Sequence, residues 1–331
     1  MVRFGIIGFG LHAVKRLMPG FARTSNCKVT ALSRRDRQRA DECSKQFQIP
    51  HAFTSVEELC ASPEVDAVLV TSPNACHLSE VLTAAKHGKH ILCEKPMGMN
   101  AAECREMVEA ANKAGVLLGI AHVFRFTETV PYFRQLLATG QIGRPTFAHS
   151  DFSFFAPSDH PRKWLHDRSI AGGGPIADIG VHCVDTLRYI LNDEVTEVTA
   201  VGTTDEYSRD VESAAVMTLR FSKGTLATSS VSFRAEYHSP LSIHGETGVI
   251  SANDGLAVDF PVTVNLEQNR KIVSQQTFSN ELAYAKQADE FANAVQGKAT
   301  YRCLGEEGWQ NQRILDAAFR SMQSGHPERV N

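Results

Sequence analysis

Short apolar runs alternate with longer amphipathic segments over the first 122 residues of the chain. The runs lack clean polar alternation, as strands buried on both faces do, and predict strands at residues 2–7, 28–32, 65–70, 90–93 and 116–120. The segments between them have helical spacing and predict helices at residues 11–21, 37–47, 55–61, 75–87 and 101–114. Because each strand is followed by a helix, we expect a doubly wound parallel sheet covered on both faces.

The pattern changes near Thr146 to runs with two-residue alternation, as in residues 212–221, where every second side chain from Ala215 to Phe221 is apolar. Further strands are expected around Val262 and at residues 147–154, 195–201, 225–234, 241–244 and 271–277. Turn signals such as Lys223-Gly224 separate several of them, which predicts a large, mainly antiparallel sheet with one open face. Helical patterns follow at residues 281–295 and about 306–322.

These patterns predict an α/β protein of two domains, a Rossmann domain at residues 1–122 and an α+β domain at residues 123–331. The length of 331 residues agrees, since a domain has about 150 residues, and 43% hydrophobic content can fill both cores. The apolar runs fall short of the roughly 20 residues that a membrane helix needs, so no membrane association is expected.

Charge and cysteine content narrow the class of partner. Lys and Arg number 34 against 37 Asp and Glu, so no basic field exists to bind nucleic acid, and a small molecule is the expected partner. The eight cysteines are scattered without a CxxC pair or a zinc-like His spacing, so we expect no metal site and mostly buried thiols. The N-terminus lacks the features of a signal peptide, which predicts a cytoplasmic protein with reduced thiols.

The first expected strand runs into a G-x-G-x-x-A motif that opens the first expected helix, Gly8-Phe9-Gly10-Leu11-His12-Ala13. In such a motif the first glycine allows a tight turn, the second lets a pyrophosphate approach the backbone, and a small last residue permits close packing of helix on strand. The helix N-terminus favours the phosphate charge. Glycines can also mark a plain turn, but this position in a strand–helix–strand pattern indicates that residues 8–12 bind a dinucleotide.

The end of the second expected strand is where a reader of the adenosine ribose would lie. NAD-binding proteins usually place an acid there, whereas this chain has Ser33 followed by Arg34 and Arg35. Guanidinium groups suit a 2′-phosphate, so NADP(H) is the expected cofactor and NAD(H) the alternative. In a second interpretation the two arginines are merely solvated and Asp36 caps the next helix.

Polar residues follow the third and fourth expected strands. The third ends in Thr71-Ser72-Pro73-Asn74, with His77 close behind, and the fourth ends in Glu94-Lys95-Pro96. Ligands of open α/β sheets bind at the carboxyl ends of the strands, so we expect both segments to face the nicotinamide half of the cofactor. Lys95 has the alternative interpretation of a surface lysine, but its place beside a strand-ending proline favours a function, and a cis Pro96 would help to aim it.

A glycine run, Gly172-Gly173-Gly174, precedes Pro175 and a helical pattern. Asp178, His182 and Asp185 are spaced to share one face of that helix, and a histidine flanked by carboxylates can exchange protons near neutral pH. The alternatives are a solvated polar face or a histidine satisfied in a core. The glycines, which allow close approach of a substrate or of backbone, favour a site.

Taken in order, the glycine motif, residues 71–77, Glu94-Lys95-Pro96 and residues 172–182 resemble the Gfo/Idh/MocA oxidoreductases, a family that includes sugar and inositol dehydrogenases. The resemblance covers essentially the whole chain, and Ala13 in place of the last glycine is the only departure in the fingerprint. It implies an N-terminal Rossmann domain and a C-terminal domain with an open, mainly antiparallel sheet. That sheet often joins subunits, so a homodimer or homotetramer through its open face is expected.

The resemblance also implies site residues. Lys95, Asp178 and His182 would be the catalytic trio, and residues 71–74 with Glu94 would touch the nicotinamide riboside. Arg125 and Trp164 would lie near cofactor or substrate. The aromatic and basic residues of segment 152–168, which ends at Arg168, could form a substrate wall or merely cover the sheet.

The expected reaction is reversible hydride transfer between nicotinamide and a hydroxyl or carbonyl carbon of a sugar or polyol. His182 would move the hydroxyl proton, Lys95 would polarise the substrate oxygen, and Asp178 would orient one or both, so the trio would gather at a bound nicotinamide ring. Two alternatives stay open on the same fold: a non-catalytic dinucleotide sensor and an NAD-dependent glycosidase. The intact trio argues against the first, and Arg34 with Arg35 favours an exchangeable NADP(H) over the second.

Overall fold

The computed structural model describes residues 1–157, 159–206, 208 and 210–331, which form two compact units. One unit consists of Met1–Val123 and Leu282–Gln310, and the other of Phe124–Glu281 and Asn311–Asn331. The division expected from the sequence, residues 1–122 and 123–331, therefore differs from these units mainly at Leu282–Gln310, which it placed in the second domain. Leu282–Gln310 belongs with the first unit because its aromatic residues pack there: Phe291 lies 5.9 Å from Phe4, centroid to centroid, and Tyr301 lies 5.3 Å from Phe291.

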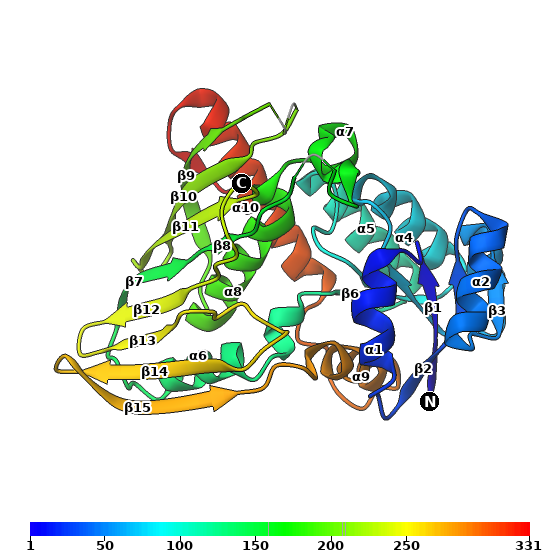
Figure 1. The fold of residues 1–331 in the computed structure, drawn as a ribbon, viewed down its shortest axis with the longest axis horizontal. Coiled ribbons are helices and arrows are strands. Elements are labelled where there is room, and N and C mark those ends of the chain that lie inside the picture. Colours follow the sequence, from blue (N-terminus) through cyan, green and yellow to red (C-terminus); the bar gives the residue numbers. More distant parts are fainter. Residues whose placement is uncertain (158, 207, 209) are drawn as a thin grey trace. The chain divides into compact units, whose positions relative to one another are not determined.

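The first unit contains a six-stranded parallel sheet in the order β3-β2-β1-β4-β5-β6. Strands β1, β2, β3 and β6 are labelled in Figure 1. Doubly wound sheets that bind dinucleotides have this strand order, so the expectation of a doubly wound parallel sheet is confirmed. Its strands are β1 (Val2–Ile7), β2 (Cys27–Ser33), β3 (His51–Phe53), β4 (Ala67–Val70), β5 (His90–Cys93) and β6 (Leu118–Ile120). Its helices are α1 (Met18–Phe21, preceded by a π-helical turn at Ala13–Leu17), α2 (Arg37–Phe47), α3 (Val56–Ala61), α4 (His77–Lys86), α5 (Ala101–Ala114) and α9 (Ala283–Val295).

The second unit contains a ten-stranded sheet in the order β15-β14-β13-β12-β7-β11-β10-β9-β16, with β8 paired to β11. All pairs are antiparallel except those of β11 with β7 and β8, so the expectation of a large, mainly antiparallel sheet is confirmed. The strands are β7 (Pro145–Ser150), β8 (Phe152–Ser153), β9 (Val195–Thr203), β10 (Ala214–Phe221), β11 (Leu226–Ser232), β12 (Leu241–Gly245), β13 (Val249–Ala252), β14 (Val262–Gln268), β15 (Lys271–Phe278) and β16 (Glu328–Arg329). The helices are α6 (Thr129–Ala138), α7 (Arg168–Ala171), α8 (Val181–Leu191) and most of α10 (Gly305–Ser324).

The two faces of this sheet differ in burial. On β10, Ala215, Met217, Leu219 and Phe221 are all buried, and the Met217 methyl group lies 3.3 Å from where a Cβ of Gly180 would be, so this face packs on the helical layer. On the other face Val216 pairs in register with Val201 of β9, and the two side chains are 45% and 67% exposed. The sheet therefore has the one open face that the alternation predicted.

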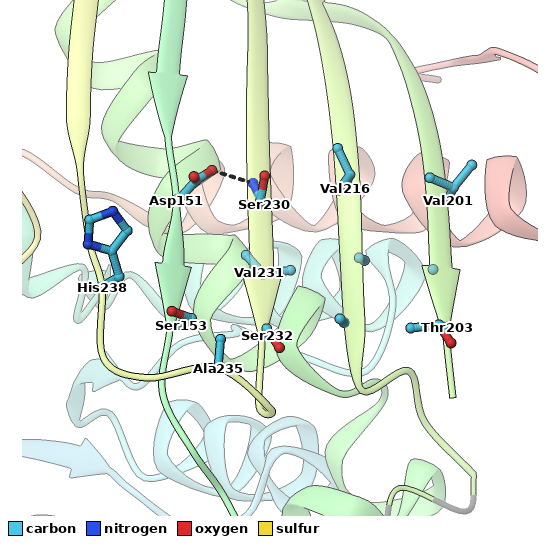
Figure 2. Close-up of a pocket in the computed structure, with 13 residues that line it drawn as sticks. Asp151, Ser153, Val201, Thr203, Val216, Ser230, Val231, Ser232, Ala235 and His238 are labelled. Atoms are coloured by element: carbon cyan, nitrogen blue, oxygen red, sulfur yellow. Dashed lines mark hydrogen bonds between the residues drawn. The ribbon is translucent and has the colours of Figure 1, made fainter. Parts of the chain in front are cut away.

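A pocket of about 440 Å³ lies on this open face (Figure 2). It is lined by Asp151, by residues of β8 to β11 and by the loop that carries His238, and the Asp151 carboxylate accepts the Ser230 N–H at 2.6 Å. None of the site residues expected from the sequence lines it. Among the described residues, no helix has the length and apolar character needed to cross a membrane.

Candidate functional site

The glycine motif of the first unit forms a tight turn at the end of β1. Gly8 has φ +74°, and a Cβ there would lie 2.7 Å from the backbone nitrogen of Ser72, so only glycine fits. A Cβ on Gly10 would meet only the Gly8 carbonyl oxygen, at 3.6 Å, among the described residues, which leaves room for a ligand against the backbone. Ala13 is fully buried where its helix packs on the sheet. These properties fit a dinucleotide phosphate at the start of the helix.

Two residues at the end of β2 form hydrogen bonds with the backbone of this turn. The buried Ser33 accepts the Phe9 N–H at 3.1 Å, and Arg34 donates to the Phe9 carbonyl at 3.2 Å, so Arg34 folds back onto the glycine motif. Arg35 is exposed. Asp36 accepts the Arg39 N–H at 2.9 Å and caps α2, which is the role that the alternative interpretation gave it. The cap and a phosphate-binding role for the arginines are compatible, since they use different side chains.

The segment after β4 is tied to the segment after β5. Thr71 donates to the carbonyls of Ile7 and Gly8, at 3.0 and 2.9 Å. His77 is fully buried, with one ring nitrogen 2.9 Å from the Ser72 carbonyl and the other 3.1 Å from that of Pro96. Burial lowers the pKa of His77. The structure thus shows His77 joining two loops from within the core, while its predicted contact with cofactor stays a prediction.

Glu94, directly after β5, has an imidazole and a backbone N–H as its partners. Its carboxylate is 2.9 Å from His12 Nε2 and accepts the Lys95 N–H at 3.2 Å, and the Lys95–Pro96 peptide bond is cis, as the sequence suggested. Burial raises the pKa of Glu94, but the charges of His12 and Lys95 outweigh it, so the net shift is downward. Glu94 is therefore an ionised, positioned carboxylate next to the expected catalytic lysine.

Glu80 is a site-adjacent carboxyl that the sequence pattern did not single out. It lies in the first turn of α4 and accepts a short hydrogen bond from the hydroxyl of Ser72. Burial raises the pKa of Glu80 to about 7, against the opposing effects of Ser72 and Arg35. Its position three residues after His77 on a helix was the only available signal, and it does not distinguish a buried carboxyl from a solvated one.

In the second unit, Asp178 and His182 follow the glycine run as expected. Asp178 lies in a π-helical turn, Ile176–Gly180, that leads into α8. The two residues are 7% and 9% exposed, so the alternative of a solvated polar face is excluded. The His182 ring has its centroid 4.8 Å from that of Phe124, edge to face, and Arg162 lies 3.7 Å from the Asp178 carboxylate.

Asp185 and Arg125 form a buried ion pair instead of presenting free charges. Arg125 donates two hydrogen bonds, of 2.9 and 2.7 Å, to the two carboxylate oxygens of Asp185, and Asn311 donates a third at 2.8 Å. The two charged side chains are 3% and 2% exposed. This network packs α8 into the unit, and the sequence-based role of Arg125 near cofactor or substrate stays a prediction.

The other residues expected near substrate lie toward the surface. Trp164, in the short turn Lys163–His166, is half-buried, and Arg168 is exposed, with its Nε donating to the Asp210 carbonyl at 2.9 Å. In segment 152–168, Phe154 packs on Phe233 and Phe155 is exposed, so the segment both covers the unit and offers an aromatic surface. Ser158 of this segment lies outside the described residues.

Comparison with known proteins agrees with the two units. Residues 2–122 match the sequence model of the Gfo/Idh/MocA oxidoreductase family with an NAD-binding Rossmann fold, and residues 131–251 match that of the Gfo/Idh/MocA C-terminal domain. A 1,5-anhydro-D-fructose reductase of Ensifer adhaerens is 33% identical over 93% of this chain and 92% of its own length. A D-xylose 1-dehydrogenase (NADP(+)) of Haloferax volcanii is 29% identical over 97% of this chain and 98% of its own.

The fold has close counterparts among solved structures. The crystal structure of an aldose-aldose oxidoreductase from Caulobacter crescentus, complexed with glycerol, superposes with a TM-score of 0.90 at 24% identity and covers 99% of both chains. The glycine turn at Gly8, the Glu94-Lys95-Pro96 segment and the helix with Asp178 and His182 thus occur in a chain that matches both family domains. The protein belongs to the Gfo/Idh/MocA family of oxidoreductases with an NAD-binding Rossmann fold.

Proposed function

We propose that this oxidoreductase interconverts a hydroxyl and a carbonyl group of a sugar, polyol or related small molecule, with NADP(H) preferred. The observation that carries the proposal is the end of β5, where Lys95 follows a carboxylate held by His12 in the unit with the dinucleotide turn. The names of two similar proteins, an anhydrofructose reductase and an NADP(+)-dependent xylose dehydrogenase, support the substrate class. A bound nicotinamide would accept or donate the hydride.

The proposed roles follow from the chemistry of the side chains. Lys95 donates a hydrogen bond to the substrate oxygen and stabilises the negative charge that develops there. His182 takes up or returns the hydroxyl proton, for which an imidazole suits neutral pH. Asp178 orients its partner, and its own carboxylate is steadied by Arg162 at 3.7 Å.

The preference for NADP(H) rests on Arg34 and Arg35. Arg34 already lies against the glycine motif through the Phe9 carbonyl, and Arg35 is exposed beside it in sequence. Two guanidinium groups at the end of β2 would form charge-assisted hydrogen bonds to a 2′-phosphate. A 2′-hydroxyl would offer them no interaction of comparable strength.

The test is a panel of aldoses, inositols, anhydro sugars and keto sugars, followed at the nicotinamide absorbance with each cofactor. With the best substrate, Lys95→Ala should lower kcat about 100-fold or more, the size of effect seen when one such donor is removed, while NADPH binds as before. Lys86→Ala is the matched control, because Lys86 is an exposed lysine of α4 whose only described ion pair is with Glu57 at 3.7 Å. Unchanged turnover in Lys95→Ala would refute the assignment, and no redox change with any substrate would favour a dinucleotide sensor.

We further propose that two copies of the chain associate through the open face of the second unit's sheet, as a homodimer or as part of a homotetramer. Val201 and Val216, paired in register and exposed, form an apolar centre there, and Phe147 of β7 is 60% exposed. A second copy would offer the same apolar surface, as two-fold symmetry requires.

A further inference from the structure

Glu212 is a buried carboxyl group that caps a distant helix. It lies just before β10, is 1% exposed, and accepts the Gly174 N–H at 2.9 Å and the Ile176 N–H at 3.0 Å through one oxygen, Oε1. These N–H groups open the helical turn Ile176–Gly180 and would otherwise lack an acceptor within the helix. Pro175, at the N-cap position, has no side chain that can accept them. A residue far along the chain therefore supplies the cap.

The glycine run is shaped to this contact. A Cβ on Gly174 would lie 2.1 Å from the backbone carbonyl oxygen of Glu212, and a Cβ on Gly173 would lie 2.4 Å from the ring of Phe319. A side chain at position 174 would meet backbone that cannot yield, and one at position 173 would require the Phe319 ring to move. The two glycines therefore allow close approach of protein to protein, and the strand end that carries Glu212 is pressed against the start of the helix.

The cap is connected to Asp178 through one residue. Gly174 donates its N–H to Glu212 and accepts the Asp178 N–H at 3.0 Å with its carbonyl oxygen. Asp178 begins the pair that His182 completes one turn later. A shift of the Glu212 carboxyl group would thus move Gly174, whose carbonyl oxygen in the next peptide unit fixes the Asp178 backbone.

Burial raises the pKa of Glu212, although the N–H groups of Gly174 and Ile176 and the charge of Arg168 oppose the shift. Its second oxygen, Oε2, has no hydrogen-bond partner among the described residues. A buried oxygen without a partner lowers the stability of the fold. A serine or aspartate at the N-cap position could cap the helix without that loss, so stability alone does not explain a glutamate at this place.

We propose that Glu212 is a positioning residue for catalysis, which acts through Gly174 to hold Asp178 and His182 in their working orientation. The inference rests on the proposed function, because it assigns Glu212 a role in that same site. Glu212 is only 1% exposed, so in this role it acts through the start of the helix and not on substrate or cofactor directly. What it sets is the geometry of the helix start, so the length and the acceptor atom of the side chain matter more than its charge.

The test compares three substitutions in the full-length protein. Glu212→Gln keeps a carbonyl oxygen at the same reach and should retain kcat within about threefold. Glu212→Asp is one methylene shorter and cannot reach both N–H groups, so it should lower kcat at least tenfold, as should Glu212→Ala. The KM for NADPH should stay within twofold in all three, because the dinucleotide-binding residues belong to the first unit. Asp210→Asn is the matched control, an exposed carboxyl two residues away whose side chain should not matter.

A second readout does not depend on turnover. The titration of the His182 imidazole, assigned by its loss in His182→Gln, can be followed by NMR in each variant. Its midpoint should shift in Glu212→Asp and Glu212→Ala and stay near wild type in Glu212→Gln. If no sugar is turned over, this shift still supports the positioning role while the proposed function fails. If Glu212→Asp behaves as wild type in both kcat and the His182 titration, or if Glu212→Gln is as impaired as Glu212→Ala, the proposal is overturned.

Discussion

At the scale of single residues, burial and bonding separate side chains that the sequence presents alike. Asp178 and Asp185 share a helical pattern, yet Asp185 is bound by Arg125 and Asn311, whereas Asp178 lies 3.7 Å from Arg162. The spacing of polar residues cannot reveal this, because the partners come from distant segments. A charged residue in a motif is therefore only a candidate functional residue until the structure shows which side chains bind it.

The arginines after β2 give the first prediction. Replacing Arg34 and Arg35 together with Ala should weaken NADPH binding about 10- to 100-fold, since each charge-assisted hydrogen bond to a phosphate contributes about 1.5 kcal/mol or more. NADH binding, measured by the same calorimetric titration, should change by less than threefold. Arg37→Ala is the control, because the guanidinium of Arg37 is an exposed donor to the Ala52 carbonyl, at 3.1 Å. Equal weakening of both cofactors would mean that the arginines do not read the 2′-phosphate.

Glu80 gives a prediction about pH. Its pKa in the folded protein, about 7, is above the ordinary value of 4.5, so the folded state holds the proton more tightly than the unfolded chain does. Stability should therefore fall as pH rises from about 4.5 to 7 and level off above that. Glu80→Gln, which cannot ionise, should lose this part of the pH dependence and be more stable than wild type above pH 7, as measured by urea unfolding at several pH values.

The exposed Glu58 of α3 provides the control for this comparison. Glu58→Gln should leave the slope of stability against pH between 4.5 and 7 as in wild type, since the side chain is solvated. A Glu80→Gln protein with the wild-type slope would show that Glu80 titrates near its ordinary value in the folded state.

At the scale of elements, long periodic segments were predictable and short or interrupted ones were not. Helices α2 and α5 begin and end where the pattern placed them, since each starts after an Asp or Asn cap. Strand β3 was missed because His51–Phe53 has only three half-buried residues, and α6 was missed because Pro131 interrupts its pattern, although proline is tolerated in a first turn. The π-helical turn before α8 has no signature in the spacing of its residues.

The cap of α5 allows a direct measurement of how one residue sets a helix boundary. Asn100 accepts the Glu103 N–H at 3.0 Å, and Glu103 in turn accepts the Met99 N–H at 3.0 Å, a reciprocal capping arrangement. Asn100→Ala should lower the free energy of unfolding by about 1 kcal/mol, measured by urea unfolding. Asn100→Asp keeps an acceptor and should cost far less, so an equal loss in both variants would contradict the role of the cap.

At the scale of the whole molecule, the chain order does not follow the compact units. The segment Leu282–Gln310 returns to the first unit, where Asp289 accepts the Ser25 and Asn26 N–H groups, at 3.0 and 3.1 Å. A helical pattern near the end of a sequence carries no mark of the unit it joins, because the deciding contacts are with residues more than 250 positions away. The class of each sheet, parallel in the first unit and mainly antiparallel in the second, was in contrast predictable from local patterns, whereas the strand order was not, since β7 lies between β12 and β11.

The open face of the second unit supplies the last prediction. If two copies associate there, a carboxylate at Val216, the partly exposed neighbour of Val201 at its apolar centre, would have to be buried in the interface without a partner. Val216→Glu should therefore convert the protein to a monomer in sedimentation velocity at micromolar concentration, while the dinucleotide still binds with wild-type affinity. Lys298→Glu, an exposed change in the first unit, should leave the assembly intact. A Val216→Glu protein that sediments as wild type would place the contact between copies elsewhere or show that the chain acts alone.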